Sequence, residues 1–367
     1  MPEVFQLGHL PIKDHSFSPN RDILAITKED WVEVYSMAAG KPQLFATLKE
    51  HDKTVTAVDI SPDGTKILTC SQDRNALVWE WNGTEFKPTL VLLRINRAAT
   101  CCRWSPDGRK FAVGSSDRVV AVCYYEEENN WWVSKHLKKP MRSTITCIDW
   151  HPNGVLLAAG GTDGHARVFS AYIKGLDAKP EPTVWGSKLP FQTLCGDFEN
   201  DTKAWIHGVA FSPSGNALGY AAHDGTVTVV YPGGEGQPPR AFYEVKSNNL
   251  PFKSLTFIND SQIVAGGHSC NLVIYQGNEQ GWKEGKKVEN DAPIVEPASA
   301  GDEDVEMNTS QALHMFKQMD LKGRVTKIQP GKSLPTTHQN TITAVRNYGP
   351  GKVSTSGADG KIVIFSI

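Results

Sequence analysis

The sequence predicts an all-β fold, a seven-bladed β-propeller built from four-stranded sheets. The first observation is a repeat in which an acidic or small turn residue is followed, six residues later, by an aromatic or apolar anchor. Its seven copies are Glu29–Tyr35, Asp73–Trp79, Asp117–Cys123, Asp163–Phe169, Asp224–Val230, Ser269–Tyr275 and Asp359–Phe365. Successive anchors are 44, 44, 46, 61, 45 and 90 residues apart, and the short intervals match the ~40–45 residues of one propeller blade. Seven anchors therefore predict seven blades.

A second marker lies about ten residues before most of the acidic turn residues. Its copies are Ser61–Gly64, Ser105–Gly108, His151–Gly154 and Ser212–Gly215, with weaker ones at Ser18–Asn20 and Gly349–Gly351. Proline followed by Asp or Asn and then Gly is typical of tight turns, because Pro fixes φ and Gly tolerates positive φ. Short alternating segments such as Val55–Ile60 flank these turns and indicate strands.

The third observation concerns ring closure. Residues Val4–Leu10 precede the first repeat and resemble a spare strand, while the chain ends at Ile367, just after the seventh anchor. We expect the N-terminal segment to supply the fourth strand of the last blade, because closure removes open sheet edges. The expected organisation is residues 1–282 for the closing strand and six blades, 283–335 for an insertion, and 336–367 for the last blade.

The long interval before the last anchor corresponds to this insertion. Residues Glu289–Glu306 are acidic, rich in Ala, Pro and Gly, and nearly free of bulky apolar side chains, a composition typical of disorder. Residues Thr309–Asp320 follow and form the one convincing amphipathic pattern, with Leu313, Met315, Phe316 and Met319 on one helical face. Two interpretations remain open: a helix folded back on the propeller, or a tethered helix that docks in a partner's groove.

Composition excludes several classes of function. The 367 residues carry a net charge of −2, which argues against nucleic-acid binding. No apolar run approaches the ~18 residues of a membrane span, and no signal peptide is visible. Seven scattered cysteines without metal-binding spacing favour free thiols in a reducing cytosol. Catalytic, nucleotide-binding and metal motifs are absent from the sequence, so we expect no enzyme activity, cofactor or metal.

Two of the predicted blades resemble the WD-repeat pattern, in which a His before the first strand, the turn Asp and a strand Trp form a buried polar network. His51, Asp73 and Trp79 match it, while His338 and Asp359 match it with Phe365 in place of Trp. These pairs could be mistaken for catalytic residues. We interpret them as structural, because the Asp recurs at the blade period whereas catalysis needs a single special site.

The chain resembles one WD-repeat family along nearly its whole length, the WD-repeat subunit of the actin-related protein 2/3 complex. The segments that carry the resemblance are Thr69–Ala76, Lys87–Ala99, Asn130–Val133, Asp149–Asn153, Phe169–Lys174 and Trp185–Lys188. That family also has a protruding helical insertion between its last two blades, which corresponds to Thr309–Asp320. The acidic stretch Glu289–Glu306 has no counterpart, and we assign it no family role.

The resemblance implies a non-catalytic scaffold that packs against other subunits of the complex and supports actin nucleation and branching. It further implies that Leu313, Met315, Phe316 and Met319 contact the actin filament or nucleation-promoting factors. The expected location is the cytoplasm and its actin cytoskeleton, including cortical actin patches. The competing interpretation is a free-standing WD40 propeller that recruits peptides, such as a ubiquitin-ligase or chromatin adaptor.

Overall fold

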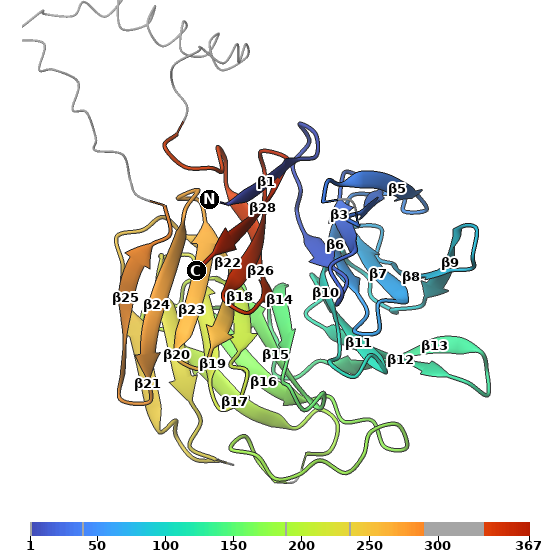
Figure 1. Cartoon of the computed structure of the whole chain (residues 1–367). Helices are drawn as coiled ribbons and strands as arrows, with labels where there is room; N and C mark the ends of the chain where they lie inside the picture. Colours follow the sequence, from blue (N-terminus) through green and yellow to red (C-terminus); the bar gives the residue numbers. More distant parts are fainter. Residues whose placement is uncertain (1, 39, 188, 235, 290–333) are drawn as a thin grey trace, which may run out of the picture.

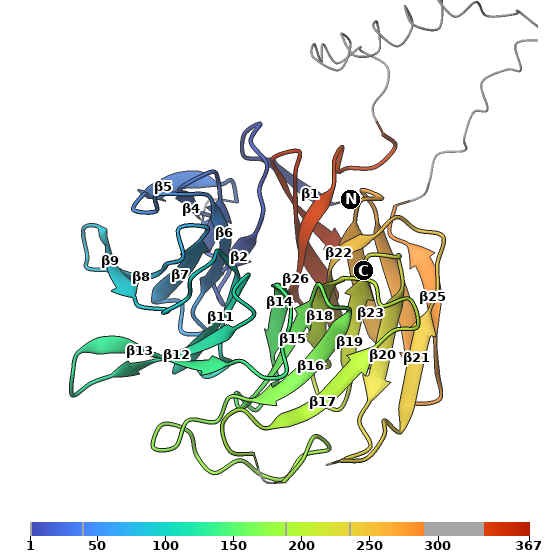
Figure 2. The same cartoon turned by 180° about the vertical axis from the view of Figure 1, so that it is seen from behind.

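A computed structural model describes residues 2–38, 40–187, 189–234, 236–289 and 334–367. Within these residues every regular element is a β-strand, and the strands form seven four-stranded antiparallel sheets. The sheets are arranged as the blades of a ring (Figures 1 and 2). The predicted seven-bladed propeller is therefore confirmed. No helix in the described part is long and apolar enough to cross a membrane.

Each blade takes four strands in order from the inner strand to the outer strand. Blade 1 comprises β2 (His15–Phe17), β3 (Ile23–Thr27), β4 (Val32–Ser36) and β5 (Gln43–Leu48). Blade 2 comprises β6 (Val55–Ile60), β7 (Lys66–Ser71), β8 (Ala76–Trp81) and β9 (Phe86–Val91). Blade 3 comprises β10 (Ala99–Trp104), β11 (Lys110–Ser115), β12 (Val120–Glu126) and β13 (Trp131–Leu137). Blade 4 comprises β14 (Ile145–Trp150), β15 (Leu156–Gly161), β16 (His165–Ser170) and β17 (Leu194–Glu199). Blade 5 comprises β18 (Ile206–Phe211), β19 (Leu218–Ala222), β20 (Val227–Tyr231) and β21 (Ala241–Val245). Blade 6 comprises β22 (Phe252–Asn259), β23 (Gln262–Gly267), β24 (Leu272–Asn278) and β25 (Gly281–Lys287). Blade 7 comprises β26 (Ile342–Gly349), β27 (Lys352–Gly357), β28 (Lys361–Ser366) and, as its outer strand, β1 (Glu3–Gln6).

The repeat anchors all occupy the third strand of their blades, from Tyr35 in β4 to Phe365 in β28. The predicted turns join the inner strand to the second strand. In blade 2, Ser61 accepts a hydrogen bond from the Lys66 amide at 2.9 Å, and Gly64 has a φ of 74°. Positive φ is a conformation that glycine adopts at little cost, which explains why Gly closes this turn.

The hydrophobic core is divided into seven clusters, and each lies between two neighbouring blades. Leu77 and Trp79 of blade 2 pack against Val34 of blade 1, for example. The inner strands contact one another in the order β2, β6, β10, β14, β18, β22 and β26, and β26 returns to β2. Each sheet therefore buries both of its faces, and its apolar surface is covered only when the ring is complete.

Strand β1 closes the ring. It pairs antiparallel with β28 and places Glu3 opposite Ile364 and Gln6 opposite Lys361, so the two ends of the chain lie beside each other (Figures 1 and 2). Phe5 and Leu7 also pack against the cluster between blades 7 and 1. The expected closing strand is thus present, although it ends at Gln6 rather than at Leu10.

Two insertions interrupt the regular blades. The first joins β16 to β17, and its Trp185 is 1% exposed and lies in the core between blades 4 and 5. The second follows β25, which runs to Lys287, so the expected boundary at residue 282 falls inside a strand. The predicted helix Thr309–Asp320 and nearly all of the acidic stretch lie outside the described residues.

Deleting residues 1–10 should lower the free energy of unfolding by roughly 2–4 kcal/mol, because blade 7 loses its outer strand and the packing of Phe5. Urea denaturation of the full and truncated chains measures this difference. Glu3→Ala is the matched control, since it keeps the backbone pairing of β1 and removes an exposed side chain that forms an ion pair with Lys352 at 3.4 Å. A truncated chain that stays monomeric, soluble and equally stable would contradict this account of ring closure.

Candidate functional site

The structure brings His51, Asp73 and Trp79 together in blade 2. His51 Nδ1 lies 2.7 Å from Asp73 Oδ2, and His51 Nε2 lies 2.9 Å from Thr69 Oγ1. Trp79 Nε1 donates to the same hydroxyl at 3.0 Å. Thr69 therefore links the histidine to the tryptophan. The sequence analysis predicted the His51, Asp73 and Trp79 network without this threonine.

This network is buried and its hydrogen-bonding capacity is used inside the blade. The side chains of His51 and Asp73 are 1% and 5% exposed. Asp73 also accepts hydrogen bonds from the amides of Asp52 at 3.1 Å and Asn75 at 2.9 Å. The carboxylate thus ties the loop before the inner strand to the turn before the third strand, and no part of the group is placed to meet an external substrate.

Blade 7 repeats this arrangement with one substitution. His338 Nδ1 lies 3.1 Å from Asp359 Oδ1, and His338 Nε2 lies 2.8 Å from Thr355 Oγ1. Phe365 takes the tryptophan position, with its ring centroid 6.4 Å from that of His338. Burial favours the neutral carboxyl, but the hydrogen bond and charge of His338 outweigh it and hold the pKa of Asp359 below its usual value. A Cβ at Gly357 would overlap both His338 and Asp359.

Blade 5 uses an asparagine where a histidine is absent. Asn200 is 2% exposed, and its side-chain oxygen accepts hydrogen bonds from Tyr220 at 2.5 Å and Thr228 at 3.0 Å. Its amide nitrogen donates to Thr226 at 3.0 Å. The sequence analysis missed this network. Its one local signal is that Asn200 lies in the loop before the inner strand β18, six residues before that strand begins, as His51 lies in the loop before β6.

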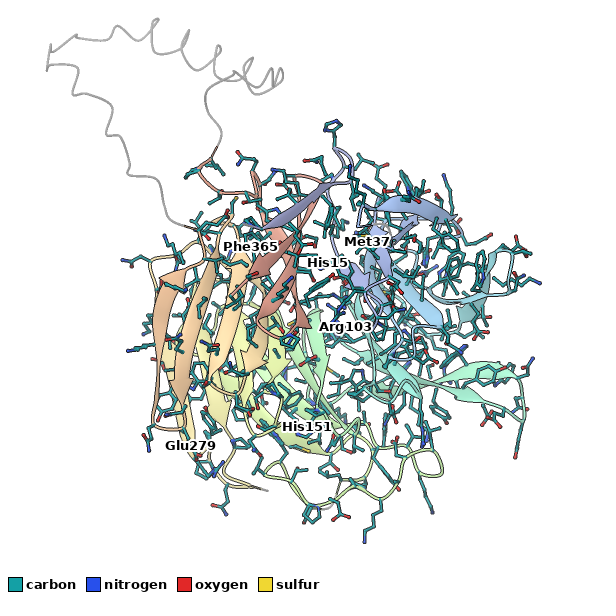
Figure 3. The ribbon with its side chains drawn as sticks, viewed as in Figure 1. His15, Met37, Arg103, His151, Glu279 and Phe365 are labelled. Atoms are coloured by element: carbon teal, nitrogen blue, oxygen red, sulfur yellow. The ribbon has the colours of Figure 1, made fainter. Side chains whose placement is uncertain are left out.

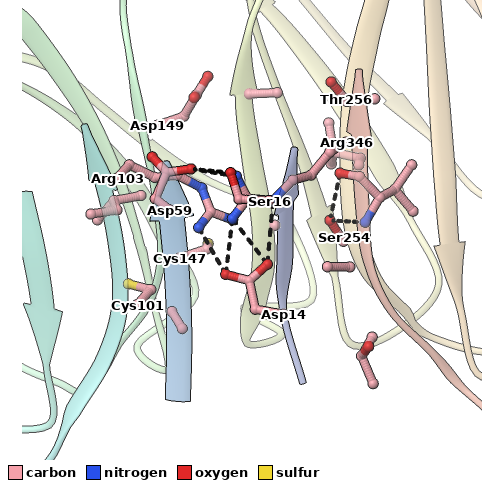
Figure 4. A pocket seen from close by; sticks show the side chains of 18 of the residues that line it. Asp14, Ser16, Asp59, Cys101, Arg103, Cys147, Asp149, Ser254, Thr256 and Arg346 are labelled. Carbon is pink, nitrogen blue, oxygen red and sulfur yellow. Dashed lines mark hydrogen bonds and ion pairs between the residues drawn. The ribbon is translucent and has the colours of Figure 1, made fainter. Parts of the chain in front are cut away.

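The inner strands of all seven blades surround a central cavity of about 420 Å³. Arg346 of blade 7 forms ion pairs across it with Asp14 of blade 1 at 3.0 Å and with Asp59 of blade 2 at 2.6 Å. Arg103 of blade 3 contacts the same Asp14 at 3.0 Å (Figure 4). Figure 3 labels His15 and Arg103 near the centre of the ring. The network therefore connects four blades.

The charges of this network depend on one another. Burial alone would raise the pKa of Asp14, but the Arg103 and Arg346 guanidiniums lower it to about 2. Because the pKa of Asp14 is lower in the folded chain than in the unfolded chain, its charge stabilises the fold at pH values above about 4. This contribution to the free energy of unfolding is lost as the pH falls from about 4 to about 2. Asp149 lies beyond the ion pairs, and burial raises its pKa to about 6.

A threonine hydroxyl joins neighbouring blades at one register position of the inner strands. Thr56 donates to the carbonyl of Ala99 at 3.0 Å, and Thr100 donates to that of Ile145 at 2.6 Å. Thr146 and Thr343 make the same contact with the next blade. At each of these threonines the inner strand carries a β-bulge, as at Thr56 between Val55 and Ala57 in β6, and a bulge re-aims the side chain.

No metal site emerges from the described part of the chain, where His, Cys, Asp and Glu side chains do not gather in threes. All seven cysteines are free thiols, and five of them are buried. The four side chains expected to contact a partner, Leu313, Met315, Phe316 and Met319, lie outside the described residues. The polar groups that the structure does bring together serve to hold the blades and line the cavity.

A closed ring of seven four-stranded blades with His–Asp–Thr networks defines a WD-repeat β-propeller. The WD40 family model (WD domain, G-beta repeat) matches residues 42–80, 93–122 and 134–170. Three curated relatives are similar over nearly the full length. Actin-related protein 2/3 complex subunit 1 of Schizosaccharomyces pombe is 46% identical (100% of this chain, 99% of that protein), its Saccharomyces cerevisiae namesake is 48% identical (99% and 97%), and subunit 1A-B of Xenopus laevis is 40% identical (97% and 94%). The chain belongs to the actin-related protein 2/3 complex subunit 1 family.

We expect Asp73→Ala to lower the free energy of unfolding by about 1–3 kcal/mol, because His51 and two backbone amides would lose their buried acceptor. Urea denaturation with far-UV circular dichroism measures the change. Asp52→Ala is the matched control, since this neighbouring side chain is exposed and its loss should matter by less than about 0.5 kcal/mol. Equal stability of the two variants would rule out a structural role for the network.

Proposed function

We propose that the protein is a non-catalytic scaffold subunit of an actin-related protein 2/3 complex and supports actin filament nucleation and branching. The observation that carries this proposal is identity of 46% and 48%, over 99% or more of the chain, to two proteins named as subunit 1 of that complex. The described structure is consistent with a scaffold, because its histidines and carboxylates are largely used in contacts within and between blades. The corresponding location is the cytoplasm and its actin cytoskeleton, including cortical patches.

An exposed aromatic cluster on blades 1 and 2 supports a role in assembly. Phe45 of β5 and Trp81 of β8 are 47% and 42% exposed, and their ring centroids are 5.0 Å apart. Phe86 of β9 lies 5.1 Å from Trp81, and Leu90, on the same face of β9, is 51% exposed. These four residues continue the core between blades 1 and 2 out to the surface.

Aromatic side chains grouped on a surface are typical of protein interfaces, where tryptophan often contributes much of the binding energy. We assign this cluster, Phe45, Trp81, Phe86 and Leu90, to contact with another subunit of the complex. A subunit held permanently in an assembly can keep such a surface covered, whereas a propeller that recruits peptides transiently would expose it to solvent between binding events.

Affinity purification of the tagged full chain at native abundance tests the assignment. We expect a stable multi-subunit complex that contains both actin-related proteins. Trp81→Ser should reduce recovery of the other subunits roughly tenfold or more, because a central aromatic contact is lost. Glu80→Ser is the matched control, since Glu80 is the neighbouring residue on the opposite face of β8, and it should leave recovery unchanged.

Recovery of transient peptide ligands in place of a complex would favour the alternative, a free-standing adaptor for ubiquitin ligation or chromatin. Thermal unfolding of the isolated Trp81→Ser chain serves as the check on folding. If the complex forms equally well with the wild type and with Trp81→Ser, the scaffold function is supported, but the aromatic cluster is not part of the interface.

We further propose that Leu313, Met315, Phe316 and Met319 contact the actin filament or nucleation-promoting factors. The support is their spacing on one face of the helical pattern Thr309–Asp320. A single helix of about 12 residues is marginal in water, so its order depends on packing against another surface. The length of the insertion gives this segment the reach to meet a partner.

Phe316→Asp places a charge in the middle of this apolar face, where a partner's groove would have to desolvate it. We expect normal thermal unfolding, normal incorporation into the complex and reduced branch formation in a purified actin assay. Gln318→Asp is the matched control, because it adds the same charge on the polar face. Loss of thermal stability in the isolated Phe316→Asp chain would favour a helix folded back on the propeller, and full branching activity would remove the proposed contact.

A further inference from the structure

In four blades, a threonine of the inner strand donates its hydroxyl to a backbone carbonyl of the next blade, a contact that we call a threonine clasp. At this position of the inner strands, one mouth of the central cavity carries two kinds of side chain. Blades 2, 3, 4 and 7 place Thr56, Thr100, Thr146 and Thr343 there, and each hydroxyl is used to join the next blade. The other three blades carry a basic residue at this position. These residues are Lys13 of blade 1, His207 of blade 5 and Lys253 of blade 6.

The equivalence of these positions follows from the clasps themselves. Thr146 donates to the carbonyl of Ile206, the residue before His207, and Thr343 donates to that of Ile12, the residue before Lys13. The basic positions therefore fall on blades 5, 6 and 1, within one half of the ring, and the opposite half of the mouth carries only threonine. Such a one-sided distribution of charge is not needed to hold the blades together.

The two lysines have no counter-charge in the described part of the chain. Neither Lys13 nor Lys253 has an ion pair or side-chain hydrogen bond there, and Asp14, the carboxylate next to Lys13 in sequence, is held by Arg103 and Arg346. The cavity lining as a whole carries more positive than negative groups. They are Lys13, Arg21, Arg103, Lys253 and Arg346 against Asp14, Asp59 and Asp149.

Three histidines lie beside the lysines of this mouth. His207 Nε2 lies 2.8 Å from His223 Nδ1, and His268 Nδ1 lies 3.0 Å from Thr341 Oγ1. Burial, together with the charges of Lys253, His223 and His268, lowers the pKa of His207 to about 4. Burial also lowers the pKa of Lys253. Lys253, His223 and His268 thus oppose protonation of His207, and a bound anion would relieve that repulsion.

We propose that this mouth, formed by Lys13, His207, Lys253 and His268, binds a small anion that bears more than one phosphate group. Each phosphate brings up to two negative charges and three acceptor oxygens, and the basic residues come from three different blades, so a ligand with several phosphates can contact more than one of them. A cavity of about 420 Å³ admits such a ligand. Bound there, it would join blades 5 and 6 to blade 1 across the closure between blades 7 and 1.

Binding can be measured by calorimetry on the purified full chain, with pyrophosphate and inositol hexakisphosphate as soluble probes. Phosphatidylcholine vesicles, with and without a phosphoinositide, test whether the phosphate comes from a lipid headgroup. We expect a rise in the melting temperature with probe concentration, because a ligand that binds only the folded state stabilises it. Affinity should fall as salt is raised.

The double variant Lys13→Gln, Lys253→Gln removes two charges and keeps similar side-chain length. It should weaken binding by roughly tenfold or more, since hydrogen bonds to charged groups are among the strong ones. Lys87→Gln is the matched control, because Lys87 is an exposed lysine on the outer strand β9, and it should bind like the wild type. His268→Gln, at the exposed rim, is the second variant should the double variant not fold.

Loss of soluble-probe binding in the double variant, with Lys87→Gln unaffected, would support a free phosphate ligand. Binding confined to phosphoinositide vesicles and lost in the double variant would support the same site with a lipid headgroup. Equal binding by the wild type and the double variant, no binding of any probe, or binding of an oligoglutamate peptide in preference to the phosphates would overturn the proposal. None of these results depends on membership of a complex.

Discussion

Every blade of this protein is a sheet with two apolar faces, and neither face can be covered by the blade itself. Seven clusters between neighbouring blades bury these faces, so the stability of each sheet depends on the completeness of the ring. The cluster between blades 7 and 1 contains few fully buried side chains, among them Leu24 and Ile362. The pairing of β1 with β28 protects this seam by removing the open edge of the last blade. Strand exchange between the two chain ends is therefore the contact that holds the whole arrangement closed.

The polar interior follows from the same constraint. Inner strands that converge on an axis bring carbonyls, amides and charged side chains close together, and buried polar groups must be paired. Threonine clasps satisfy carbonyls between blades, while Arg346 and Arg103 neutralise Asp14 across the cavity. Where this position holds Lys in place of Thr, in blades 1 and 6, the strand still folds, and the lysine makes no ion pair with the described residues. One position in the repeat thus serves the ring in four blades and offers different chemistry in three.

The outer surface of the ring offers the contact that we propose for assembly. Edge strands such as β9 expose Leu90, and the neighbouring Phe45 and Trp81 form an aromatic cluster that no described residue covers. A propeller provides a rigid frame on which such contacts keep a fixed geometry, because each blade is held on both sides. Binding energy can then be used for assembly without the cost of ordering a flexible surface. In this proposal the outer aromatic cluster serves assembly, whereas the ion pairs and threonine contacts of the interior hold the ring together.

The repeat predicted the fold and the number of blades, and the count of strands predicted the closing strand, whereas the His–Asp pairs were predicted from the resemblance to the WD-repeat pattern. His51 and Asp73 could be paired from sequence since they belong to one blade and one repeat. The Thr69 bridge, the Asn200 network and the contact between Asp14 and Arg346 could not. Asp14 and Arg346 are 332 residues apart in the chain, and they meet only because ring closure brings the first and last inner strands to the same axis. Periodicity specifies what each blade contains, whereas the side chains that face one another across the cavity are chosen by the geometry of the closed ring.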